Sequence, residues 1–209
     1  WFVVPASAVL NMPSLKASRR SRIGLLGGSF NPVHSGHLHI SRLALGRLAL
    51  DEVWWLVSPQ NPLKSGSCMA PLNERLKAAQ ELADGADIQV TNFEHELGTH
   101  YTVDTIDALK RRFPDIRFVW LMGADILAEV HQWHNWLSIF HSVPVAVFAR
   151  PTYSFKAAKS KAARRLARYR LDSRRASALA EARPPAWVSM RTPLDPTSAT
   201  EIRAHMRTR

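Results

Sequence analysis

The chain has 209 residues, of which 46% are hydrophobic, and its formal net charge is +11 at pH 7. This length allows a core of ordinary size, and the hydrophobic content excludes a disordered chain. No apolar run reaches the length of about 18 residues that a membrane span needs, so no membrane partner is expected. The single cysteine, Cys68, excludes an internal disulfide and favours a cytoplasmic protein.

Residues 1–21 are expected to form a leader outside the fold, and residues 22–209 a single domain. Trp1 is not an ordinary initiator, whereas Met12 is a plausible one, with a short basic lead-in after it. The first ten residues are apolar, and Ala6-Ser7-Ala8 imitates a signal cleavage site. However, no basic region precedes the apolar run, as a secretory signal would require.

Short apolar runs then alternate with amphipathic stretches, which is typical of parallel strands joined by helices. The predicted strands are Ile23–Leu26, Val53–Val57, Ile88–Val90, Arg117–Met122 and Val143–Phe148. The predicted helices span residues 36–50, 71–84, 103–113 and 136–141, one or two helices within 159–182, and a short helix from Ser198. This order predicts an α/β fold with a doubly wound, mostly parallel sheet. Its ligand would lie beyond the carboxyl ends of the strands.

The segment from Gly27 to His37 joins the first predicted strand to the first predicted helix. Gly27 and Gly28 are expected to turn the backbone tightly and bring it close to a ligand. Loop N–H groups and the helix N-terminus favour an anion there. His34 and His37, three residues apart, would project from one face and donate to phosphate oxygens. The alternative is that both histidines merely cap the helix.

A second anion site is predicted at the start of the last helix. Ser198 and Glu201 form a capping box, which by itself is a structural device. Thr200 and Arg203 would share one face of that helix, next to its exposed N–H groups.

The basic stretch from Lys156 to Arg183 has few acidic residues. One interpretation is a nucleic-acid-binding module. However, Tyr169 is the only aromatic residue in its dense part, which weakens a stacking platform for bases. We favour a solvated basic surface that also attracts anionic nucleotides.

The sequence Gly-Gly-Ser-Phe-Asn-Pro-Val-His-Ser-Gly-His resembles the signature of the nucleotidyltransferase superfamily, and more closely that of bacterial nicotinate-nucleotide adenylyltransferases. The resemblance covers about residues 22–207 and implies a Rossmann-like nucleotidyltransferase fold. It implies that ATP phosphates contact Gly27, Gly28, Ser29, Phe30, His34 and His37. The later segment Thr197–Arg203 resembles Ile-Ser-Ser-Thr-x-x-Arg, so Ser198, Thr200 and Arg203 would also contact ATP. Ala199 replaces the second serine of that pattern.

Three segments resemble the nicotinate branch of the superfamily: 58–64, 99–105 and 123–136. The resemblance implies an acceptor site made by Asn61, Lys64, Tyr101, Thr102, Asp125, Trp133, His134 and Arg150. In the family, the residues matching Thr102 and Trp133 hold the nicotinate.

The residue types suit these roles. Thr102 begins a helix whose N–H groups could take a carboxylate, or it is a plain helix cap. Trp133 offers a flat face to a pyridine ring, or it packs in the core, as is expected of Trp136. Lys64 suits a phosphate, or it is a solvated surface lysine. Asp125, at the end of a predicted strand, could bind a ribose hydroxyl.

The resemblance implies transfer of the adenylyl group of ATP to nicotinate mononucleotide. His34, His37 and Arg203 would be catalytic through charge stabilisation, because the acceptor phosphate is already ionised and needs no general base. Mg²⁺ is expected on the ATP phosphates, with no fixed protein site. Nicotinamide mononucleotide and phosphopantetheine are the alternative acceptors. The segments around Thr102 and Trp133 argue against phosphopantetheine, whereas a carboxylate and a carboxamide differ by few contacts, and a homo-oligomer remains open.

Overall fold

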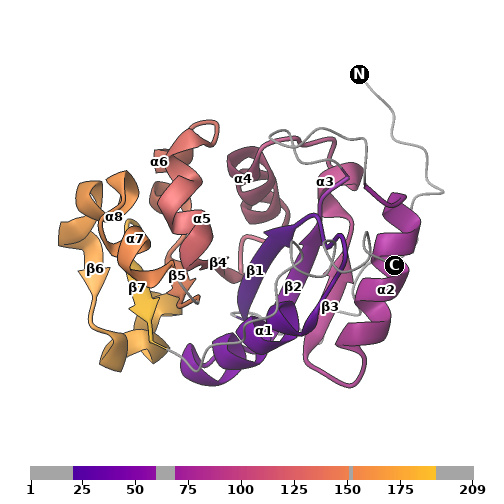
Figure 1. Cartoon of the computed structure of the whole chain (residues 1–209), viewed down its shortest axis with the longest axis horizontal. Coiled ribbons are helices and arrows are strands. Elements are labelled where there is room, and N and C mark those ends of the chain that lie inside the picture. Colours follow the sequence, from indigo (N-terminus) through magenta and orange to yellow (C-terminus); the bar gives the residue numbers. More distant parts are fainter. Residues whose placement is uncertain (1–20, 60–68, 151–152, 192–209) are drawn as a thin grey trace, which may run out of the picture.

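The computed structural model describes residues 21–59, 69–150 and 153–191, which form a seven-stranded parallel sheet with helices on both faces (Figure 1). The strands are β1 (Arg22–Gly28), β2 (Glu52–Val57), β3 (Ile88–Thr91), β4 (Arg117–Gly123), β5 (Val145–Phe148), β6 (Arg170–Leu171) and β7 (Trp187–Met190). Their order is β3-β2-β1-β4-β5-β7-β6. The predicted fold class is therefore confirmed.

Helices fill the connections between the strands. The α-helices are α1 (Ser35–Arg47), α2 (Leu72–Ala83), α3 (Phe93–Glu96), α4 (Thr102–Arg112), α5 (Ala124–Glu129), α6 (Trp136–Ser142), α7 (Ser154–Ala158) and α8 (Lys161–Arg165). The 3₁₀-helices are η2 (Val130–Gln132), η3 (Ala167–Tyr169) and η4 (Ser173–Glu181). In the described part of the chain, no helix has the length and apolar character to cross a membrane.

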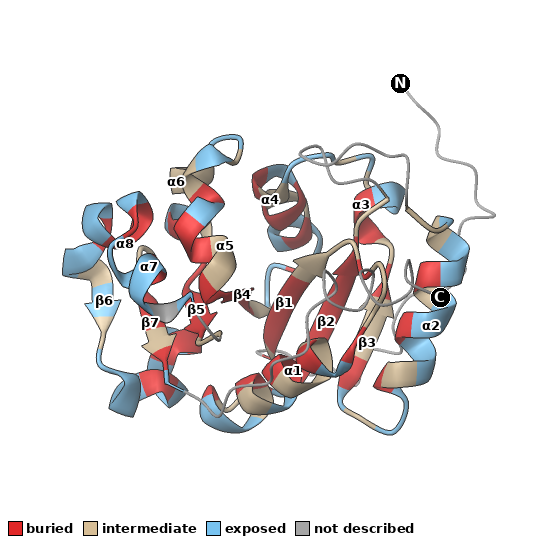
Figure 2. Cartoon of the chain, viewed as in Figure 1, coloured by how far each residue is buried: buried red, intermediate tan, exposed pale blue. Residues whose placement is uncertain are grey.

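The central strands are apolar on both faces because helices cover both. Every residue of β2 is buried (Figure 2). Successive side chains of a strand point to opposite faces of the sheet. Trp54 accordingly packs into the cluster formed with α4, α5 and α6, whereas Trp55 packs into the cluster formed with α1, α2 and η4. Both indoles are 0% exposed, so β2 joins the two halves of the core.

The five predicted strands are present, with small shifts at their ends. β5 begins at Val145 instead of Val143, and Pro144 instead accepts a hydrogen bond from the Trp120 backbone N–H. The short strands β6 and β7 and the one-turn helix α3 were not predicted. The predicted leader (apart from Ser21) and the helix from Ser198 lie outside the described residues.

The prediction of one or two helices within residues 159–182 is only partly confirmed, because the helical segments there are short and interrupted. The segment instead contains α8, η3, β6 and η4. Two N-cap side chains begin new helical segments. Ser160 Oγ accepts from the Ala163 N–H at the start of α8, and Asp172 Oδ1 accepts from the Arg174 N–H at the start of η4. The run of basic side chains also offers few acidic partners at helical spacing, so a long helix there lacks support.

The strand order places the ligand site. From β1 the chain proceeds to β2 and β3 on one side, and it then crosses to β4 on the other side of β1. Connections leaving β1 and β4 therefore diverge at their carboxyl ends and open a crevice, as in other doubly wound sheets.

Candidate active site

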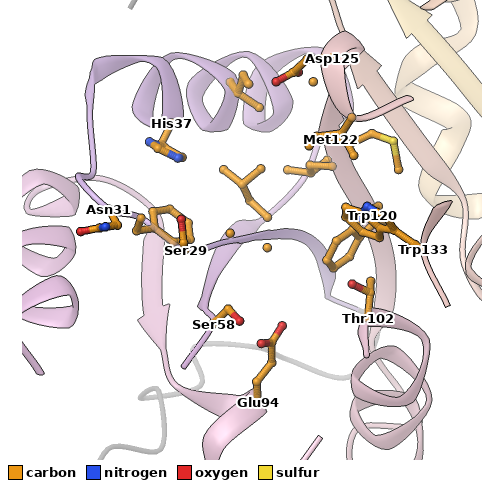
Figure 3. A pocket seen from close by; sticks show the side chains of 18 of the residues that line it. Ser29, Asn31, His37, Ser58, Glu94, Thr102, Trp120, Met122, Asp125 and Trp133 are labelled. Atoms are coloured by element: carbon orange, nitrogen blue, oxygen red, sulfur yellow. The ribbon is translucent and has the colours of Figure 1, made fainter. Parts of the chain in front are cut away.

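A cavity of about 340 Å³ lies at the carboxyl ends of β1 and β4 (Figure 3). The loop after β1, the first turn of α1, the start of α4 and the segment after β4 line it. Every predicted site residue within the described ranges lines this cavity: Gly27, Gly28, Ser29, Phe30, His34, His37, Tyr101, Thr102, Asp125, Trp133, His134 and Arg150. Asn61, Lys64, Ser198, Thr200 and Arg203 lie outside the described residues, so their placement remains a prediction.

The two glycines of the loop do not make its turn, contrary to the sequence-based expectation. Gly27 and Gly28 are the last residues of β1, and the left-handed residue is Phe30, with φ of 48°. A Cβ on Gly27 would lie 2.6 Å from Cη2 of the buried Trp120. Gly27 is therefore required by packing against β4, which the sequence of the loop alone does not reveal.

The Phe30 ring positions His37. It is 2% exposed and packs between Trp55 and His37, with ring centroids 5.2 Å and 4.6 Å away. A positive φ is unfavourable for a bulky residue. These contacts hold the backbone in that conformation, a form of local strain that is common at functional sites.

His34 and His37 cap α1 reciprocally. The Gly36 N–H donates to His34 Nδ1 at 3.1 Å, and the His34 N–H donates to His37 Nδ1 at 3.2 Å. Because both Nδ1 atoms accept, each neutral imidazole carries its proton on Nε2. The capping interpretation is thus confirmed, and it is compatible with the phosphate-binding one. The cap selects the tautomer that makes Nε2 the donor.

The pKa of His37 is lowered from 6.5 to about 3. Burial of the imidazole is the main cause, and electrostatic repulsion from the neighbouring His34 and from Arg150 adds to it. His37 is therefore neutral at physiological pH and can offer an Nε2–H without first losing or gaining a proton.

The opposite wall of the cavity begins with α4. Thr102 is the first residue of this helix, Tyr101 is its N-cap, and Tyr101 makes no side-chain capping hydrogen bond. The plain-cap interpretation of Thr102 is therefore wrong, and the first N–H groups of the 11-residue helix are left for other acceptors. The Tyr101 ring stacks on His134 at 4.3 Å. Trp136, as expected, packs against the core, edge-on to Phe140.

An ion pair lies between the two walls. Asp125 is in the first turn of α5 and not at the end of a strand, and its Oδ1 is 3.6 Å from Arg150 Nε. A Cβ on Gly123 would lie 2.2 Å from that oxygen and 3.0 Å from Arg150 Nε. The glycine that ends β4 therefore makes room for both charged groups in the cavity.

Sequence reasoning missed the acid on the cavity floor. Glu94 of α3 is 9% exposed and lines the cavity near Ser58 (Figure 3). Burial raises its pKa, while a hydrogen bond from the Ser58 side chain and the charge of His100 oppose the rise. Nothing in the local sequence distinguishes Glu94 from the exposed Glu96, because both lie in the same helical turn.

Two further features of the sequence concern metal binding and the basic stretch from Lys156 to Arg183. The described ranges contain no group of three His, Cys, Asp or Glu side chains that could hold a metal ion. In the basic stretch, Arg164, Arg165 and Arg168 are exposed. Tyr169 packs against the core, with the Arg168 guanidinium 4.6 Å from its ring centroid. That ring is therefore a poor platform for bases.

Comparison with known sequences gives a consistent result. Residues 25–205 match the model of the cytidylyltransferase-like family. A protein of Caulobacter sp. strain K31, named probable nicotinate-nucleotide adenylyltransferase, is 50% identical over 182 residues, which are 87% of this chain and 96% of that one. A protein of Gluconacetobacter diazotrophicus with the same name is 50% identical over 89% of this chain and 86% of its own.

Solved structures share the fold. The Plasmodium falciparum nicotinic acid mononucleotide adenylyltransferase complexed with NaAD superposes with a TM-score of 0.65. It has 15% sequence identity, and the superposition covers 88% of this chain and 83% of that one. A putative nicotinate-nucleotide adenylyltransferase of Vibrio parahaemolyticus gives a TM-score of 0.52 at 18% identity, over 65% and 77% of the two chains. At these identities the likeness shows the fold alone.

Proposed function

Because the chain belongs to the cytidylyltransferase-like family and, with its relatives, to the nicotinate-nucleotide adenylyltransferases, we propose that it joins ATP and nicotinate mononucleotide. The products are nicotinate adenine dinucleotide and pyrophosphate, in NAD biosynthesis. The observation that carries the proposal is one cavity with hydrogen-bond donors on two walls. The capped histidines of α1 form one wall and the uncapped start of α4 forms the other.

The reaction needs positioning and charge stabilisation. A phosphate oxygen of the acceptor attacks the α-phosphorus of ATP in line, and the bond to the bridging oxygen breaks, so pyrophosphate leaves with the electron pair. The acceptor phosphate is already ionised, and no group has to remove a proton. The Nε2–H groups of His34 and His37 and loop N–H groups would donate to oxygens that gain charge, and Arg203 would join them.

The other wall suits a nicotinate. A carboxylate accepts from the N–H groups at the start of α4, and the helix dipole favours its charge there. Trp133, partly buried beside this helix start in the cavity lining, would stack on the pyridine ring. Asp125 would accept a hydrogen bond from a ribose hydroxyl, and Arg150 would bind phosphate.

Mg²⁺ would enter with ATP. Since the described side chains form no metal-binding group, the ion would be held by phosphate oxygens and water, as is usual for Mg²⁺. The chemistry that the ion supplies is neutralisation of phosphate charge. A cytoplasmic location belongs to the same proposal, because the substrates are soluble nucleotides and Cys68 is the only cysteine.

A panel of acceptors tests the proposal. Pyrophosphate release is followed with ATP, Mg²⁺ and, in turn, nicotinate mononucleotide, nicotinamide mononucleotide and phosphopantetheine. We expect the highest kcat/KM with nicotinate mononucleotide. A higher kcat/KM with nicotinamide mononucleotide or with phosphopantetheine would assign that compound as the acceptor. If no acceptor gives pyrophosphate release, the enzyme assignment is overturned.

A further inference from the structure

Arg75 of α2 is a buried cation beside the candidate active site. The residue is 3% exposed, and among the described side chains no carboxylate forms an ion pair with it. Its guanidinium instead donates to four carbonyl oxygens. Nε donates to Ala70 at 2.9 Å, Nη1 to Ser29 and Ser58 at 2.7 Å each, and Nη2 to Pro59 at 3.0 Å.

These carbonyls belong to three segments, two of which line the cavity. Ser29 follows β1 in the loop assigned to ATP phosphates, and Ser58 follows β2; both line the cavity (Figure 3). One nitrogen, Nη1, therefore joins the loop after β1 to the end of the neighbouring strand. Ala70, just before α2, also donates its N–H to Asn31 Oδ1 at 3.3 Å, which ties the same segments together again.

The bond to Ser29 also orients a donor of the loop. The peptide between Ser29 and Phe30 is planar and trans, so its N–H points opposite to its carbonyl. With the carbonyl held by Arg75, the direction of the Phe30 N–H in the cavity wall is fixed. The rigid fork of arginine can hold several carbonyls at once, which the single ammonium of lysine cannot match.

The charge of Arg75 is the second part of the argument. Removing a cation from water is unfavourable, and carbonyl dipoles offset only part of that cost. Burial accordingly lowers the pKa of Arg75. A neutral donor could hold the same carbonyls with a smaller desolvation penalty. A cation behind a phosphate-binding loop, however, also attracts the negative charge of the ATP phosphates.

We infer that Arg75 is a positioning residue for adenylyl transfer, which holds the phosphate loop against Ser58 and places a positive charge behind the ATP phosphates without touching either substrate. The inference rests on the proposed function for its reaction, but its effect on ATP binding does not depend on the acceptor.

Two variants separate the fork from the charge. Arg75→Lys keeps the charge and loses the fork, so kcat should fall about tenfold to a hundredfold, as for other small misplacements, while KM for ATP changes little. Arg75→Met loses both, so kcat should fall and KM for ATP should rise. Lys77→Met removes an exposed charge from the same helix and should leave both parameters unchanged.

Folding is measured in the same samples. Circular dichroism at the assay temperature gives the folded fraction, to which kcat is normalised. If Arg75→Met does not fold, the kcat of Arg75→Lys alone tests the inference. The inference is overturned if folded Arg75→Lys keeps kcat within threefold of the wild type, or if the folded fraction accounts for the whole loss. Isothermal titration calorimetry with ATP alone tests the role of the charge. ATP should bind more weakly to Arg75→Met than to the wild type, and equally well to Lys77→Met. This result does not depend on whether nicotinate mononucleotide is the acceptor.

Discussion

His37 connects local structure to chemistry through its two ring nitrogens. Nδ1 is used by the cap of α1, so the proton of the neutral ring resides on Nε2. The pKa of about 3 keeps the ring neutral across the physiological range. The donor is therefore present in the free protein, and its presence does not depend on pH near neutrality.

The titration of His37 is directly measurable. We expect its ring resonances in ligand-free protein to show no titration between pH 5 and pH 9, because burial, with repulsion from His34 and Arg150, disfavours the imidazolium. NMR of the wild type, assigned by comparison with a His37→Asn variant, checks this. A midpoint near 6.5 for that ring would contradict the inferred environment.

The same shift affects stability. Between the unfolded pKa of 6.5 and the folded pKa of about 3, the unfolded chain binds a proton that the folded protein does not. Stability contributed by His37 above pH 6.5 is therefore lost as the pH falls toward 3, by at most about 1.4 kcal/mol per pH unit. Urea unfolding at pH 7 and 5 should show a larger loss in the wild type than in His37→Asn, and equal losses would refute the linkage.

Gly27 is predicted to be a packing residue. A methyl group there would meet Trp120, which is 2% exposed and cannot move aside freely. Gly27→Ala should therefore lower the free energy of unfolding by about 1–3 kcal/mol, as overpacking does. The matched change Gly46→Ala, on the open surface of α1, should be neutral or raise stability by up to about 1 kcal/mol. Equal effects in urea unfolding would show that the Trp120 contact is unimportant.

At this scale the sequence predicted which side chains gather but not always why. His34 and Trp133 follow from a motif and from the rule that ligands lie at the carboxyl ends of parallel strands. The need for Gly27 comes from a tryptophan on β4, about 90 positions away in the chain. Glu94 is likewise buried by tertiary packing, which no local pattern reports.

At the scale of elements, long apolar strands were easier to predict than short elements. β2 and β4 are continuous apolar runs, and such runs between turns are typical of buried parallel strands. β6 has two residues and α3 has four, too few for a period to be recognised. In the basic stretch, a helical composition was overridden by the caps at Ser160 and Asp172.

The cap of α8 provides a test of that interpretation. Ser160→Ala removes the acceptor for the Ala163 N–H, and it should cost about 1 kcal/mol in the free energy of unfolding. Because α8 does not line the cavity, kcat should not change. The exposed Ser177→Ala is the control. If the two variants unfold at the same urea concentration, the cap does not stabilise α8.

At the scale of the molecule, strand order brings the segments that follow β1 and β4 together at the site. β1 and β4 are neighbours in the sheet although α1, β2, α2, β3, α3 and α4 lie between them in the chain. The wall with His37 follows β1, while Asp125 and Trp133 follow β4, so the fold brings distant segments to one cavity. Arg75 then fixes the loop of the first wall from behind.

The most direct test compares pyrophosphate release by the wild type and His37→Ala, with ATP, Mg²⁺ and nicotinate mononucleotide at saturation. Loss of a preorganised donor predicts that kcat falls by about a hundredfold or more. His39→Ala, on the same helix but outside the cavity lining, should remain close to the wild type. A folded His37→Ala protein with nearly full activity would contradict the central claim that this imidazole stabilises the transferring phosphate.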